Sequence, residues 1–146
     1  LVDRFGSQTS RDLVNTSSIG AANVAAVTGT AFAKLLGHWA LALYASDQPG
    51  FTAPAELRYA SWHFRTTFAD LNAQAPSDFD RVFPLVPYSG TGGAVSVTGT
   101  LRSGSGAFVL ATQAPDGRSF ELDFSPATGG TFPTAAGAQI AVVRLR

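Results

Sequence analysis

Residues 30–45 of this 146-residue chain read TAFAKLLGHWALALYA, and this stretch decides the fold of the N-terminal half. Its apolar residues recur at intervals of three and four, which places their side chains on one face of a helix. Thr30 is of a residue type that caps helices, so we expect the helix to begin there. The other side of the helix is also unusually apolar, which predicts that it is covered on more than one face. The predicted buried stripe consists of Phe32, Leu35, Leu36, Trp39 and Leu43.

Shorter helices are predicted on both sides of this segment. The chain opens on the end of a helix that Gly6 terminates. Thr9 is placed to cap a second helix, and Ser18 to cap a third that Gly29 closes. After the long helix, residues 57–71 are rich in aromatic side chains and predict an extended entry into one more short helix.

The composition changes near residue 89. Residues 1–88 hold five glycines and residues 89–146 hold ten, and helical spacing gives way to two-residue alternation. We therefore predict an α+β chain with a helical subdomain over residues 1–88, including its aromatic-rich connection, and an antiparallel β subdomain over residues 89–146. The β subdomain is predicted to be a small sandwich or open barrel. Its predicted strands are residues 95–101, 107–112, 120–124 and 139–146.

The overall composition excludes several classes of function. Ten basic and ten acidic side chains give zero net charge, which argues against nucleic acid as a partner. The chain has no Cys, so it has no disulfide framework, thiolate metal site or Cys nucleophile. No apolar run reaches the length of a membrane span. Low charge with abundant Ser, Thr and Gly is typical of exported bacterial domains, and we expect the protein outside the cell or on its surface.

The residues that could carry chemistry are few and scattered. His38 lies in the predicted long helix and His63 beside Trp62, and neither belongs to a zinc-binding H-E-x-x-H or accompanies a G-x-S-x-G nucleophile motif. We interpret both as structural or exposed. Asp78 and Asp80 alternate as in a calcium loop, but the remaining ligand positions are missing, which favours a solvated loop. The sequence therefore predicts no catalytic, cofactor-binding or metal-ligating residue.

One stretch resembles a known family. Residues 20–44 follow the pattern G-x-x-N-V-x-x-x-T-G-x-x-F and then W-A-L-A-L-Y, and residues 58–65 read RYASWHFR. These features resemble the region after the catalytic helix in bacterial secreted zinc peptidases of the hyicolysin type and in related exported lipoproteins. The resemblance covers residues 1–88, and the closing residues 140–146 are similar to the last strand of such proteins. It implies a zinc metallopeptidase as the parent chain, with the zinc ligands and the general-base glutamate upstream of residue 1, so no catalytic residue is carried over.

The main hypothesis is therefore a non-catalytic C-terminal region that packs against an upstream catalytic domain and is not itself an enzyme. The start within a predicted helix and the lack of any Met fit a piece of a longer product. Such a piece is expected to expose an apolar patch where its neighbour sits.

Three alternatives remain open. A low-charge chain ending in a strand fits a self-assembling extracellular subunit whose partners are other copies of itself. A β-sandwich that binds carbohydrate or a cell surface would need exposed aromatic side chains. A stand-alone enzyme would need His38 or His63 in a cleft beside a carboxylate. The aromatic candidates for the carbohydrate site are Tyr88, Phe108, Phe120 and Phe132.

Overall fold

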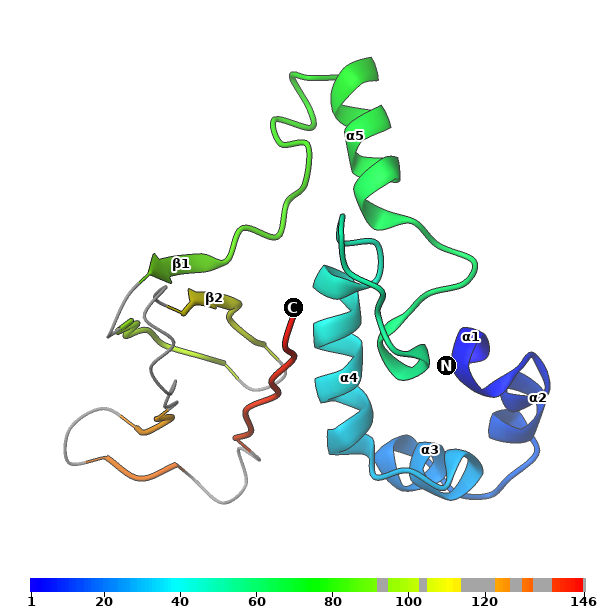
Figure 1. The fold of residues 1–146 in the computed structure, drawn as a ribbon. Helices are drawn as coiled ribbons and strands as arrows, with labels where there is room; N and C mark the ends of the chain where they lie inside the picture. Colours follow the sequence, from blue (N-terminus) through cyan, green and yellow to red (C-terminus); the bar gives the residue numbers. More distant parts are fainter. Residues whose placement is uncertain (92–94, 103–104, 114–122, 127–129, 133–137, 146) are drawn as a thin grey trace. The chain divides into compact units, whose positions relative to one another are not determined.

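The computed structural model describes residues 1–91, 95–102, 105–113, 123–126, 130–132 and 138–145. It divides into two compact units. The helical unit comprises Leu1–Phe83 together with Ala141–Arg146, and the second unit comprises Pro84–Ile140. The chain is mostly helical, with strands only in the second unit, so the predicted order of helices before strands is confirmed for the described residues (Figure 1).

The described residues of the helical unit form five α-helices and one short 3-10 helix, in agreement with the predicted helical half. Each packs on its neighbour in the chain from α1 to α4, and η1 packs on α4. The elements are α1 (Val2–Phe5), α2 (Gln8–Val14), α3 (Gly20–Thr28), α4 (Phe32–Ala45), η1 (Ala55–Leu57) and α5 (Phe64–Gln74).

The predicted helix ends are confirmed at glycines and wrong at the caps. Gly6 ends α1, and Gly29 ends α3 in the left-handed conformation with a φ of 64°. Thr9 lies inside α2 instead of capping it, and α3 and α4 begin after Ile19 and Ala31 without a side-chain cap. The hydroxyl of Thr30 donates instead to the backbone oxygen of Thr28 at 3.4 Å, which competes with capping. The backbone N–H of Ser18 donates to the hydroxyl of Thr16 at 3.0 Å.

The core of the helical unit is small and lies along one side of α4. The buried apolar residues of the described chain are Leu35, Ala42, Ala45, Ala53 and Leu57. The predicted buried stripe of α4 is therefore only partly correct, because Phe32, Leu36 and Trp39 are exposed. These three side chains line a groove that the described residues leave open.

Two polar side chains fix the positions of helices in this unit. The buried Asn23 of α3 donates from Nδ2 to the backbone oxygen of Leu13 at 2.8 Å and so ties α3 to the end of α2. Asp47, in the loop after α4, accepts a hydrogen bond from the backbone N–H of Arg65 at 2.6 Å. Arg65 is the second residue of α5, so Asp47 acts as the cap of α5 from 18 residues away.

In its described residues, the second unit holds one two-stranded sheet. Strand β1 (Tyr88–Thr91) pairs in parallel with β2 (Val109–Thr112), in the register Tyr88↔Val109 to Thr91↔Thr112. A parallel pair needs a long crossover, and residues 92–108 supply it. The side chain of Val95 in this crossover packs against Gly90, where an added Cβ would lie 2.5 Å from Val95 Cγ2.

The predicted antiparallel sandwich or barrel is not seen in the described residues. Of the predicted strands, only 107–112 coincides with a strand, and its partner runs parallel. No strand is found over residues 95–101, or over the described parts of 120–124 and 139–146. Residues 120–122 and 146 lie outside the described residues. Alternation alone does not make a strand, because a strand also needs a partner for its backbone groups.

Candidate functional site

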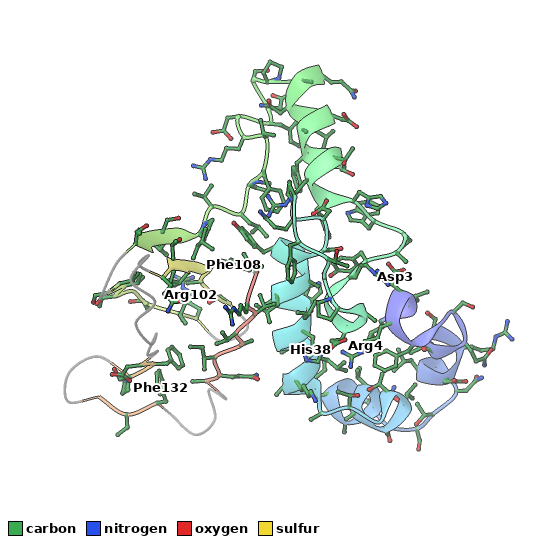
Figure 2. All side chains as sticks on the ribbon, viewed as in Figure 1. Asp3, Arg4, His38, Arg102, Phe108 and Phe132 are labelled. Carbon is green, nitrogen blue, oxygen red and sulfur yellow. The ribbon has the colours of Figure 1, made fainter. Side chains whose placement is uncertain are left out.

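The feature of the helical unit most suited to binding is a groove between α1 and α4, which we call the α1–α4 groove. Its volume is about 180 Å³, and α1, α3, α4, η1 and the two residues after η1 contribute to its lining. In Figure 2, Arg4 and His38 lie next to each other between α1 and α4. The polar residues of the lining are Asp3, Arg4, His38, Glu56, Arg58 and Tyr59.

The groove is lined mainly by apolar side chains, and four of them are exposed. Leu1 is 51% exposed, and Phe32, Leu36 and Trp39 of α4 are 37%, 38% and 53% exposed. Phe32, Leu36 and Trp39 follow one another at helical spacing, so they form a continuous strip along α4. Because water contacts this strip, covering it with protein would gain hydrophobic free energy.

A hydrogen bond between Arg4 and His38 joins α1 to α4 at the groove. Arg4 Nη1 lies 2.6 Å from His38 Nδ1. A guanidinium can only donate, so His38 Nδ1 must accept, and the imidazole is neutral with its hydrogen on Nε2. Burial lowers the pKa of His38, and the nearby charges of Arg4 and Lys34 lower it further, against a smaller opposite effect of Glu56. The contact therefore favours the neutral imidazole that it requires.

A second set of hydrogen bonds holds α1 through Asp3. The carboxylate of Asp3 accepts from the hydroxyl of Ser61 at 2.7 Å, and from the backbone N–H groups of Ala60 and Ser61 at 2.9 Å and 3.1 Å. These bonds lower the pKa of Asp3, the Ser61 hydroxyl most. Burial, followed by the charge of Asp3, raises the pKa of the neighbouring Tyr59. The short helix α1 is thus attached to α4 by Arg4 and to the segment after η1 by Asp3.

Polar groups in the groove already make hydrogen bonds with one another or with nearby residues. In a catalytic triad, the Nδ1 atom of the histidine is hydrogen-bonded to a carboxylate that orients the ring. In this chain, Nδ1 of His38 is hydrogen-bonded to the guanidinium of Arg4 instead. Asp3 is fully engaged with Ser61 and Ala60. In the described residues no group of three or more His, Cys, Asp or Glu side chains could hold a metal ion. The groove offers apolar surface with charged side chains in its lining, the basic Arg4 and Arg58 and the acidic Asp3 and Glu56.

Of the two histidines considered from the sequence, His38 lines this groove and His63 does not. His38 is half-buried, and His63 is exposed directly before α5, which it does not cap. Asp78 and Asp80 are both exposed, as expected for a solvated loop.

The second unit has an open hollow of its own, of about 350 Å³, lined in part by Tyr88 and Phe108. Tyr88 is 61% exposed, Phe132 is 40% exposed and Phe108 is half-buried, while Phe120 lies outside the described residues. Phe132 stacks on Phe124 with a ring-centroid distance of 5.0 Å. The aromatic candidates for the carbohydrate hypothesis are therefore not all buried.

Sequence reasoning missed the polar side of the α1–α4 groove. Asp3 and Ser61 are 58 residues apart, and Arg4 and His38 are 34 apart, so no local pattern connects them. The apolar side did leave a signal, because residues 30–45 are apolar around more of the helix than one core requires.

The part of the chain that the structure describes contains no helix long and apolar enough to span a membrane. Comparison with known proteins adds no relative: no family model, no curated protein and no solved structure matches this sequence.

Proposed function

We propose that this chain is the non-catalytic C-terminal region of an exported bacterial peptidase-like protein, and that its helical unit packs against the catalytic domain of that protein. The observation that carries the proposal is the exposed apolar strip of Phe32, Leu36 and Trp39 in the α1–α4 groove. A helix that serves only its own small core has no need of these three large side chains on its open side. A packing surface needs them.

The choice of a catalytic domain as the neighbour rests on the sequence resemblance. The strip lies within residues 20–44, the stretch that resembles the region after the catalytic helix in hyicolysin-type zinc peptidases. In this proposal the chain contributes no catalytic group. Its role is to bury apolar surface of the catalytic domain and so to stabilise it outside the cell.

The two tryptophans of the chain provide the test. A photo-crosslinking phenylalanine analogue is introduced at Trp39 or at Trp62 in the full-length product of the gene, and crosslinked peptides are mapped by mass spectrometry. Trp62 is a matched control because it is 51% exposed, against 53% for Trp39, and does not line the groove. We expect position 39 to crosslink to a catalytic domain in the same polypeptide and position 62 not to do so.

The other results would each count against the proposal. Crosslinks at position 39 between identical peptides of two copies would favour the self-assembling subunit instead. Equal crosslinking at positions 39 and 62 would show that the groove is no preferred surface. No crosslink to a catalytic domain at position 39 would remove the proposal.

Carbohydrate binding by the second unit is a second candidate, favoured by the exposed ring of Tyr88 at the edge of its open hollow. Sugars stack on exposed aromatic rings, and the hollow adds polar groups to such a platform. Retention of the chain on insoluble cell-wall polysaccharide, lost in Tyr88→Ala and kept in Tyr88→Phe, which preserves the ring, would support it. Equal retention of the two variants would contradict it.

A further inference from the structure

The size of the α1–α4 groove limits what it accepts. Its volume is about 180 Å³. An apolar cavity of roughly 150 Å³ is enough for one benzene molecule. The groove therefore has room for a single large side chain, such as Phe or Leu.

The polar groups at the groove are not equally available to a ligand. Asp3 already accepts hydrogen bonds from Ser61 and Ala60. The one ion pair in the described residues joins Arg65 and Asp47, so Arg4 has no carboxylate partner there. The guanidinium of Arg4 thus lies beside the apolar strip without an ion-pair partner in the described residues, while Glu56 lines the same groove.

Arg4 is also held in position before any ligand arrives. Its bond to His38 uses Nη1, which leaves the other donors of its planar guanidinium for a second acceptor. A side chain that is already oriented loses less freedom when it binds. Arg58 lines the same groove but forms no bond of this kind in the described residues.

The charges around His38 are predominantly positive. Arg4 of α1 and Lys34 of α4 both act on this side chain as cations, and the opposing effect of Glu56 is smaller than either. A negative group would be attracted to this end of the groove, and a positive group repelled.

We propose that the α1–α4 groove takes one bulky apolar side chain of the partner domain, with the carboxylate of a neighbouring residue in that domain paired to the guanidinium of Arg4. This inference rests on the proposed function and adds the chemistry of the partner segment: a large apolar residue next to Asp or Glu.

The test uses capped five-residue peptides and the intact chain. In the Trp62→Phe variant, Trp39 is the only tryptophan, so its fluorescence reports on the groove. Three peptides are titrated, with Phe-Asp, Phe-Asn or Ala-Asp at their centre. We expect Phe-Asp to bind about tenfold more tightly than Ala-Asp, from the burial of the ring. We expect a further preference of about two- to fivefold over Phe-Asn, the value of an exposed ion pair.

Two matched variants assign the preference to its residue. Arg4→Gln should abolish the preference for Asp over Asn and leave the preference for Phe over Ala, because the apolar strip is intact. Arg58→Gln should leave both preferences. Circular dichroism of each variant checks that the helices remain. Loss of the Asp preference in Arg58→Gln alone would overturn the assignment to Arg4, and equal binding of Phe-Asp and Phe-Asn to the parent would overturn the inference.

The crosslinking experiment separates this inference from the function on which it rests. A crosslink from position 39 to a catalytic domain, with no peptide preference, leaves the proposed function standing and removes the ligand chemistry. Peptide preferences without a crosslink to a catalytic domain remove the proposed neighbour and keep the ligand chemistry.

Discussion

The cap that Asp47 places on α5 leads to the most direct test of the helical unit. We expect Asp47→Ala to destabilise the chain by about 2 kcal/mol. Its Oδ2 accepts the backbone N–H of Arg65 at 2.6 Å, and its Oδ1 lies 3.6 Å from Nε of the same residue. The two side chains are 13% and 22% exposed, so the interaction is only weakly screened by water.

The magnitude follows from what the substitution removes. Loss of an N-cap costs about 0.5–2 kcal/mol, and a hydrogen bond to a charged group is worth about 1.5–3 kcal/mol. Both ranges describe the same contact, so they are not added. We therefore expect the free energy of unfolding to fall by about 2 kcal/mol. The guanidinium of Arg65 keeps its bond to the backbone oxygen of Tyr44 at 2.8 Å and its position 4.1 Å from the ring centroid of Phe83. Asp47→Asn keeps an acceptor and loses the charge, so we expect about half the cost.

Urea denaturation followed by circular dichroism measures the free energy of unfolding, and amide hydrogen exchange in α5 measures the local effect. Asp70→Ala is the matched control, because Asp70 is an exposed carboxylate on α5 outside the cap. A double-mutant cycle of Asp47→Ala with Arg65→Met should show a coupling of about 1 kcal/mol. The reasoning fails if Asp47→Ala stays within about 0.5 kcal/mol of the Asp70→Ala control.

Three further outcomes are expected. His38 has a lowered pKa in the folded chain, so the stability that its neutral form provides is present above the unfolded value of about 6.5 and is lost as the pH falls through the folded pKa. Urea midpoints at mildly acidic pH should therefore fall more in the parent than in His38→Gln, and parallel curves would refute this. Gly90→Ala should cost about 1–3 kcal/mol, because the new Cβ would lie 2.5 Å from the side chain of Val95. The added substitution Val95→Ala should restore part of this loss, and no recovery in denaturation experiments would contradict the packing. Asn23→Ala removes the donor to the carbonyl of Leu13 and should cost about 1 kcal/mol, with faster amide exchange at the end of α2 as the readout. Unchanged exchange there would show that this bond does not hold α2 to α3.

The sequence predicted the helices well where the signal is local. Gly6 and Gly29 mark helix ends because their positive φ angles are costly for other residues, and this requirement is visible in one residue type. The apolar spacing of residues 30–45 predicted α4 to within two residues at its start. Both signals depend only on neighbours within one or two helical turns.

Caps and strand pairing could not be predicted in the same way. The cap of α5 comes from Asp47 in the loop after α4. His63, directly before α5, makes no capping hydrogen bond with its side chain. The residues of β2 alternate as a strand should, but nothing in residues 107–112 indicates that their partner is β1 in a parallel register. Each depends on a contact that the fold creates, so local propensity carries no information about it.

The apolar strip of α4 shows how a correct pattern led to a wrong expectation about burial. The spacing of Phe32, Leu36 and Trp39 establishes that they share a face, but it does not state which molecule covers that face. A core residue and an interface residue are selected by the same hydrophobic gain, so both give the same periodicity. The polar edge of the strip separates the two cases. A core does not require the hydrogen bond of Arg4 to His38 beside an open strip. A surface that recognises a charged neighbour does require an oriented charged side chain of this kind. The position of Arg4 therefore adds to the exposure of the strip as a reason to propose that the strip is an interface.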